Sequence, residues 1–298
     1  MSLPHSVAIA NNKGGVGKTS LTVNIAGLAA ARGLRVLAVD LDQQANLARD
    51  LGATQAGATD DGRALTRLVL DGDPADPIPA RPGLDFYAGG PFLNDVETLL
   101  STPGRHRGDP AHALEQALAP IAGDYDLILF DCPPRAGGRT VEVALVAARW
   151  LLIPTQADDG SIDGLEQVAQ EFVRVREEHG SEIELLGVVL FDIGASHKAI
   201  HEGAVAEIAS RFGGNADGVV LSPPIRSARK VAVDTRRSGL TVQEYLDAAE
   251  TAPPWYEAVR EGRPQVGYFA QNAASVADDY RTIADQVIDR AGRHGGAQ

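Results

Sequence analysis

The chain has 298 residues, of which 44% are hydrophobic and 22% are charged, and its formal net charge is −13. This balance is typical of a globular protein with a large core, and the acidic excess argues against general electrostatic attachment to nucleic acid or anionic membrane. No apolar run reaches the roughly 20 residues of a membrane span, and no signal peptide is visible. The single cysteine, Cys132, excludes an internal disulfide. We therefore expect a cytoplasmic protein.

The first predicted element is an apolar strand at Val7–Ala10, which runs into a glycine-rich loop and then into a helix predicted near 18–31. The loop reads Asn11-Asn12-Lys13-Gly14-Gly15-Val16-Gly17-Lys18-Thr19-Ser20. Glycines let the backbone wrap round phosphate oxygens, and the helix adds its positive N-terminal end. Strand, loop and helix in this order predict a nucleotide site. In such a site Lys18 reaches the β- and γ-phosphates, and the Thr19 hydroxyl ligates Mg²⁺.

This loop departs from the usual phosphate-loop pattern in two ways. Asn12 stands where the pattern places its first glycine. A second lysine, Lys13, lies five residues before Lys18 and precedes the glycines. Because the chain contains only four lysines in all, two of them in one short loop are a strong functional signal.

Two further strands are each followed by acidic residues. The run Val36–Val39 leads into Asp40 and Asp42, and the run Leu127–Phe130 leads into Asp131. Carboxylates at the end of a strand can hold a metal ion or orient a water molecule. Aspartate is equally suited to cap a helix, and a strand that ends in aspartate is common. In combination with the loop, the pattern favours a metal role.

The rest of the chain continues the alternation of strands and helices. Further strands are predicted at 150–153, 185–191 and 219–221, and helices near 110–121, 138–148, 162–178, 198–212 and 272–291. This alternation predicts an α/β fold with a doubly wound, mostly parallel sheet flanked by helices. We expect one domain over 1–298. Residues 52–83 look irregular apart from a short helix near 65–70, and 250–268 look like an insertion that either binds a partner or packs on the core.

Three segments together resemble the ParA/MinD family of deviant Walker-type P-loop ATPases. They are Lys13–Ser20, Val39–Asp42 with Gln44, and Asp131–Pro134, and weaker similarity continues through 153–156, 164–165, 187–190 and 239–242. The resemblance covers most of the chain in the right order. It implies a P-loop NTPase fold with ATP and Mg²⁺ as cofactors. One departure is Gln43, which replaces a proline usual in the family.

The resemblance also implies roles for individual residues. Nucleotide binding is carried over to Gly14, Gly15, Val16, Gly17, Lys18, Thr19 and Ser20, and on the base side to Pro224 and Arg226. Mg²⁺ binding is carried over to Thr19, Asp42 and Asp131, and catalysis to Lys13, Lys18 and Asp42. Asp42 would position the attacking water. Lys13 would reach across a two-fold dimer to the partner's nucleotide and neutralise charge there, as an arginine finger does.

The branch of the family decides the partners. The tail at 278–290 has a narrow apolar face and predicts a packing helix rather than a membrane anchor, so we expect no membrane partner. The single cysteine excludes the nitrogenase iron protein. The ParA branch remains, which implies a homodimer in the ATP state, nonspecific DNA as partner, a ParB-like activator of weak basal hydrolysis, and nucleoid association.

The expected DNA contacts lie in the segment 226–237, which carries five positive charges and one negative charge. The basic residues are Arg226, Arg229, Lys230, Arg236 and Arg237. Doubling such a patch by dimerisation would steepen salt-dependent binding to phosphates. The alternatives are a solvated helix face and arginines that serve the nucleotide. At the level of function, the alternatives to DNA partition are a positioning ATPase for a non-DNA cargo and a metabolic ATP-dependent enzyme on the same fold.

Overall fold

An eight-stranded sheet runs through the computed structural model, which describes residues 2–102, 109–134, 137–194, 198–211, 218–252 and 269–292. The strands are β1 (Ser6–Ile9), β2 (Val36–Asp40), β3 (Ile78–Arg81), β4 (Leu84–Tyr87), β5 (Leu127–Asp131), β6 (Trp150–Thr155), β7 (Glu184–Ile193) and β8 (Val220–Arg226). Their order in the sheet is β3-β4-β2-β5-β1-β6-β7-β8. All neighbours are parallel except β3 and β4, which form an antiparallel hairpin at one edge.

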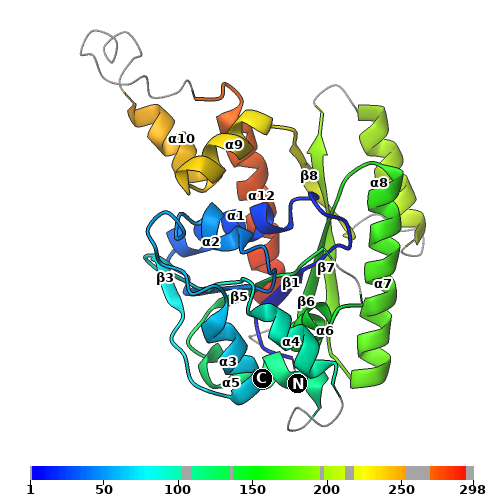
Figure 1. The fold of residues 1–298 in the computed structure, drawn as a ribbon. Coiled ribbons are helices and arrows are strands. Elements are labelled where there is room, and N and C mark those ends of the chain that lie inside the picture. Colours follow the sequence, from blue (N-terminus) through cyan, green and yellow to red (C-terminus); the bar gives the residue numbers. More distant parts are fainter. Residues whose placement is uncertain are drawn as a thin grey trace.

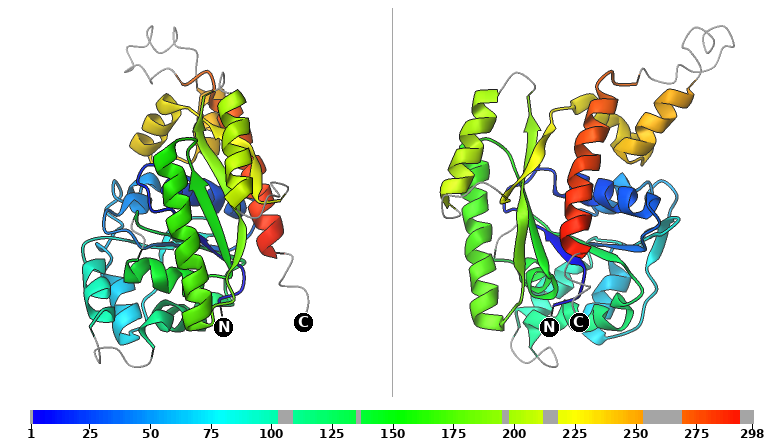
Figure 2. Two further views of the ribbon diagram at one scale, coloured as in Figure 1. Left: turned by 90° about the vertical axis from the view of Figure 1, so that its right-hand side faces the viewer. Right: turned by 180° about the vertical axis from the view of Figure 1, so that it is seen from behind.

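Helices cover both faces of this sheet (Figures 1 and 2). One face carries α1 (Lys18–Ala31), α2 (Asn46–Asp50), α9 (Arg229–Ser238), α10 (Val242–Thr251) and α12 (Ala273–Gly292). The other carries α3 (Arg63–Asp71), α4 (Leu93–Leu100), a 3-10 turn at Pro110–His112, α5 (Ala113–Ala122), α6 (Arg139–Ala147), α7 (Asp159–His179) and α8 (Lys198–Arg211). The predicted doubly wound architecture is confirmed.

The central strands are apolar on both faces for most of their length, because each face packs against a helical layer. Along β5, Leu127 and Leu129 belong to the core on the α1 side, whereas Ile128 and Phe130 belong to the core on the α6 side. Residues on alternate faces of a strand point to opposite layers. A strand buried on both faces therefore reads as a continuous apolar run, which is how the sequence identified it.

The sheet edges differ from the sequence prediction. The hairpin of β3 and β4 was missed because its strands have only four residues each, Pro79 interrupts the first, and Gly83 turns the chain with a φ of 78°. At the opposite edge, β8 continues through Pro223 and Pro224 to Arg226. An edge strand tolerates proline because one row of its N–H groups needs no partner strand.

The order β2-β5-β1 at the centre of the sheet brings together three segments that are far apart in the sequence. Residue Asp40 pairs in register with Asp131, and Asp131 pairs with Ile9 on its other side. Because these strands are parallel, the glycine-rich loop after β1 and the acidic ends of β2 and β5 meet at one edge. This is the edge at which ligands bind in open α/β sheets.

The C-terminal helix α12 lies along β8, α1 and α10 (Figure 2). Its side chains Val276, Ile283 and Val287 are buried in the core on the α1 side, so it is a packing helix as predicted. Among the described residues, the structure has no helix with the length and apolar character of a membrane span. The predicted insertion at 250–268 begins at the end of α10, and its residues 253–268 lie outside the described part of the chain.

Candidate nucleotide site

The glycine-rich loop has a backbone that only glycine adopts easily. Gly15 and Gly17 have φ angles of 79° and 92°, in the left-handed region. A Cβ atom at Gly17 would collide with the ring of Phe191, which lies directly over the loop. Gly17 is also the N-cap of α1, and no side chain caps the helix there. The first N–H groups of α1 are therefore available to an anionic ligand, as in phosphate loops.

The two lysines of the loop point to different places. The Nζ of Lys18 is folded over the loop and donates to the carbonyl oxygens of Asn11, at 3.0 Å, and Lys13, at 2.9 Å. Burial lowers the pKa of Lys18, and the nearby Asp131 opposes this. The Nζ of Lys13 instead forms an ion pair with Asp158, 2.6 Å away and beyond the end of β6, with its side chain 34% exposed. The two lysines of the loop therefore have different partners: the ammonium group of Lys18 is bound within the loop, and that of Lys13 is bound to Asp158.

Asp131 is a buried carboxylate that lacks hydrogen-bond partners of ordinary length within the described residues. The residue is 1% exposed, and neither side-chain oxygen is paired. Burial raises the pKa of Asp131 to about 7, against the opposing effects of the Thr19 hydroxyl and Lys18. A buried carboxylate without hydrogen-bond partners costs free energy of folding. Its position suggests a ligand that is not part of the protein.

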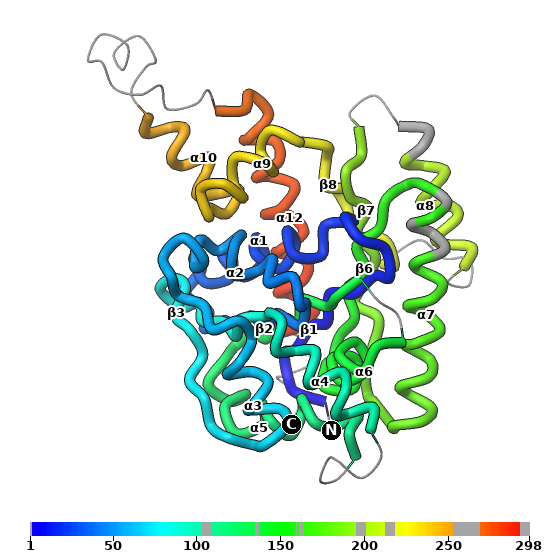
Figure 3. The backbone as a smooth tube through the Cα atoms, in the orientation of Figure 1, coloured from blue at the N-terminus to red at the C-terminus, as the bar shows by residue number. Residues whose placement is uncertain are grey.

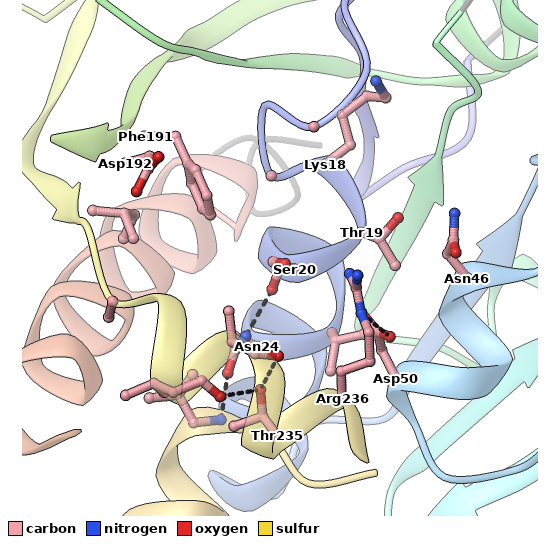
Figure 4. A pocket seen from close by; sticks show the side chains of 18 of the residues that line it. Lys18, Thr19, Ser20, Asn24, Asn46, Asp50, Phe191, Asp192, Thr235 and Arg236 are labelled. Atoms are coloured by element: carbon pink, nitrogen blue, oxygen red, sulfur yellow. Dashed lines mark hydrogen bonds and ion pairs between the residues drawn. The ribbon is translucent and has the colours of Figure 1, made fainter. Parts of the chain in front are cut away.

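The residues present fit Mg²⁺. This ion takes oxygen ligands and is usually held by one or two carboxylates together with nucleotide phosphates, rather than by a cage of protein groups. Asp131 and the Thr19 hydroxyl face each other at the phosphate loop (Figure 4 shows Thr19 and Lys18 there). Among the described residues, no group of three or more His, Cys, Asp or Glu side chains forms a metal cage. A magnesium ion here would depend on the nucleotide.

The two aspartates at the end of β2 and just after it have different surroundings, which the sequence left open. Asp40 is fully buried beside Asp131, and it accepts hydrogen bonds from the backbone N–H groups of Asp42, at 2.9 Å, and Leu47, at 3.1 Å. Burial raises its pKa well above the usual range, and the charge of Asp131 adds to the effect. Asp40 therefore holds the backbone of the segment that leads into α2, while Asp42 lines the cavity beside the loop.

A cavity of about 520 Å³ extends from the loop toward β7, β8, α9 and α12 (Figure 4). This volume is in the range of ordinary small-molecule sites. Its walls include Phe191, Asp192, Ile225 and Tyr280, none of which the sequence analysis assigned to a site. Phe191 ends an apolar strand and Tyr280 lies in a packing helix, so their residue types gave no signal.

On the expected base side, the structure brings one of the two predicted residues to the cavity. Arg226 lines it, whereas Pro224 is not among the lining residues and its neighbour Ile225 takes that place. The guanidinium of Arg226 forms a two-pronged ion pair with Asp279 on α12, with distances of 2.6 and 2.8 Å. Asp279 is only 2% exposed. The charge of Arg226 is therefore largely neutralised within the chain, which weakens its case as a DNA contact.

The four other predicted DNA-binding residues lie on α9, and two of them are also paired. Arg236 contacts Asp50 on α2 at 3.1 Å, and Lys230 contacts Asp234 one turn further along α9 at 2.6 Å. Figure 4 shows Arg236 reaching toward Asp50 across the cavity. Within the described part of the chain, no ion pair is found for Arg229 or Arg237.

Comparison with known proteins places the site in a family. A family model described as an AAA domain matches residues 5–185. The chromosome partitioning protein ParA of Caulobacter vibrioides is 32% identical over 225 residues, which cover 74% of this chain and 81% of that protein.

Solved structures share the fold. Cobyrinic acid a,c-diamide synthase from Mycobacterium smegmatis with bound ADP and magnesium superposes with a TM-score of 0.65 and is 25% identical, over 88% of this chain and 98% of that one. A Cyanothece McdA variant in complex with ATP superposes with a TM-score of 0.70 at 23% identity, over 90% of this chain and all of that one.

Proposed function

The chain belongs to the ParA/MinD family of P-loop ATPases, and from this premise we propose that it is a partition ATPase whose ATP-bound homodimer binds DNA nonspecifically. Hydrolysis of ATP to ADP and phosphate returns the protein to a form that releases DNA. A ParB-like partner accelerates hydrolysis, which is slow without it. The protein thereby segregates DNA in the cytoplasm, in association with the nucleoid.

At the loop, each residue has a distinct part in this proposal. Backbone N–H groups of Gly14–Ser20 cradle the phosphates, and Lys18 moves from the carbonyl oxygens of its own loop to the β- and γ-phosphates. Thr19 and Asp131 hold Mg²⁺, which neutralises negative charge on the phosphates. Asp42, at the cavity wall, orients the attacking water and supports the metal ion.

Lys13 carries the dimer part of the proposal. Its ammonium group is paired with Asp158, whereas that of Lys18 donates to carbonyl oxygens of the loop itself. A cation so placed is suited to meet a second molecule, where it would stabilise the charge that develops in phosphoryl transfer. If Lys13 reaches the partner's nucleotide, ATP favours the dimer by mass action and hydrolysis favours separation.

The observation that carries the proposal is that the two lysines of one phosphate loop have different partners, Lys18 within the loop and Lys13 at Asp158. Its direct test is a DNA co-sedimentation assay with ATP, with ADP and without nucleotide, in parallel with size-exclusion chromatography and light scattering. We expect a dimer and salt-sensitive DNA binding with ATP alone. DNA binding that is equal in all three states, or a monomer with ATP, would refute the proposal.

A second candidate is a positioning ATPase for a non-DNA cargo. It is favoured by one observation, namely that Arg226, Lys230 and Arg236 already have acidic partners inside the chain. In that case the ATP dimer forms as before but does not sediment with DNA at any salt concentration. A metabolic ATP-dependent enzyme would instead turn over ATP in the Lys13→Ala variant as in the wild type.

A further inference from the structure

Helix α9 has two faces with different surroundings. Arg229, Ala232 and Arg236 line the nucleotide cavity, whereas Lys230 and Arg237 do not. Val233, in the middle of the helix, is 62% exposed. The basic segment is therefore not one patch. Arg229 and Arg236 face the cavity and can contact groups there, whereas Lys230 and Arg237 face away from it and can contact another molecule.

The cavity-facing side of α9 is joined to α2 by an ion pair. Arg236 contacts Asp50 with its Nε at 3.1 Å and its Nη2 at 3.3 Å. The Asp50 side chain is 10% exposed and also receives Arg49 at 3.3 Å, whereas the Arg236 side chain is 51% exposed. The ion pair thus joins a half-exposed cation on α9 to a largely buried acid on α2.

Helix α2 is in turn hydrogen-bonded to the end of β2, next to the nucleotide site. Its second residue, Leu47, donates its N–H to the buried carboxylate of Asp40, which pairs in register with Asp131 on the next strand. Asp42, in the short segment between, lines the cavity. A rearrangement of Asp40–Asp42 would therefore reach α2 through this hydrogen bond.

Behind the ion pair, the two helices touch backbone to backbone. Gly52, just after α2, and Gly239, just after α9, approach so closely that a Cβ atom at Gly239 would lie 2.7 Å from the backbone nitrogen of Gly52. Arg81 on β3 spans the same junction, since it donates to the carbonyl oxygens of Leu51, at 3.3 Å, and Gly239, at 2.8 Å. Glu244 on α10 holds Arg81 in place at 2.5 Å. Figure 3 shows the backbone of the elements named here, α2, α9, α10 and β3.

We propose that the Asp50–Arg236 ion pair couples the nucleotide-responsive segment Asp40–Asp50 to α9. In this view Arg236 is a positioning residue that acts through Asp50, and it is not itself a contact to DNA. The Gly52–Gly239 contact and Arg81 provide the fixed point about which α9 turns. Occupancy of the nucleotide site then changes how the outward face of α9, with Lys230 and Arg237, is presented. The inference rests on the proposed nucleotide site, but not on DNA as the partner.

The test is hydrogen exchange of peptides that cover residues 229–238, with Mg²⁺ and either ADP or a non-hydrolysable ATP analogue at saturation. Coupling between sites typically amounts to between about fivefold and about 100-fold. In the wild type we expect the ATP analogue to slow exchange in α9 about tenfold relative to ADP. In Arg236→Gln and in Asp50→Asn this difference falls below about threefold.

Two further variants separate coupling from a general loss of structure. The double variant Asp50→Arg with Arg236→Asp re-forms the pair with reversed charges, and we expect it to restore most of the difference. Arg237→Gln changes the next residue on the outward face, and it should keep the full difference. A wild type without any difference, an Arg236→Gln variant that keeps it, or a swap that does not restore it would overturn the proposal.

The same variants, measured for DNA co-sedimentation, keep this inference distinct from the proposed function. If the wild type shows the exchange difference but never binds DNA, the coupling stands and the DNA proposal fails. If the wild type binds DNA only with ATP but Arg236→Gln keeps the full exchange difference, the coupling fails and the DNA proposal stands.

Discussion

The phosphate loop and helix α9 are the two regions on which the proposed function depends, and their side chains are held in different ways. The loop lies where three central strands end, and its backbone conformation shapes it. The side chains proposed to act there are buried: Lys18, in the loop, is 7% exposed, and Asp131, at the end of β5, is 1% exposed. Helix α9 carries long, exposed cations, of which Lys230 and Arg236 each pair with a single acidic side chain. Substitutions at the loop should therefore have large effects on binding and stability, and those on α9 small ones.

The largest effect is expected from Asp131→Asn in the absence of nucleotide. Folding raises the pKa of Asp131 from 3.8 to about 7, so the folded state binds more protons between these values and the free energy of unfolding falls as the pH rises from about 4 to about 7. The asparagine removes a cost of up to about 4 kcal/mol above pH 7. Denaturant unfolding at pH 5 and pH 8 measures this gain, which should be large only at pH 8.

A control carboxylate lies just before the start of β5, five residues before Asp131. Asp126 is exposed, and hydrogen bonds from Arg35 lower its pKa, so Asp126→Asn should give no gain at pH 8. An Asp131→Asn variant that is no more stable than the wild type at pH 8 would show that the buried carboxylate carries no such penalty.

Lys18→Ala should come next, with a loss of ATP affinity of about 100-fold or more. It removes a charged donor from two phosphate groups, and hydrogen bonds to charged groups contribute about 1.5–3 kcal/mol each. Isothermal titration with ATP measures the loss. For comparison, Lys13→Ala should bind ATP within about threefold of the wild type and fail to dimerise. An equal loss of ATP affinity in both variants would contradict the different roles proposed for the two lysines.

Asp42→Ala should slow ATP hydrolysis by about 100-fold, or about 2.7 kcal/mol in the barrier, because a positioned proton acceptor is lost. The same variant should accumulate as an ATP-bound dimer. Phosphate release and light scattering with ATP measure the two effects. A variant that hydrolyses ATP at the wild-type rate, or that stays monomeric with ATP, would remove Asp42 from the catalytic set.

The smallest effect is expected on the outward face of α9. Arg237→Ala should weaken DNA binding by the ATP form about fivefold and reduce the slope of log affinity against log salt by about 1, because one phosphate contact is lost. A titration with DNA at several salt concentrations measures both. Arg67→Ala removes an equally exposed arginine on α3, paired with Asp73, and should change neither. Equal effects of the two variants would indicate nonspecific charge attraction.

The sequence predicted the backbone of the glycine-rich loop and the central strands well, because local chemistry dictates them. Gly15 and Gly17 need the left-handed region, and the continuous apolar runs of β1, β2 and β5 could only be strands buried on both faces. It predicted poorly where short or exposed elements depend on distant partners. The hairpin of β3 and β4 was missed, and Phe191 and Tyr280 entered the cavity without any signal in their residue types.

By itself, the sequence determined the doubly wound fold, the family and the residues of the phosphate loop, because these follow from local backbone preferences and from motifs with fixed spacing. Only the tertiary structure decided what the charged side chains do. In the folded chain, Asp40 accepts a hydrogen bond from the backbone of α2, whereas the carboxylate of Asp131 lies unpaired near the loop. The tertiary structure also divided the cations of α9 between the cavity and the solvent. The reason is physical, since an ion pair depends on which chain segments meet in space, and spacing along the sequence does not encode that.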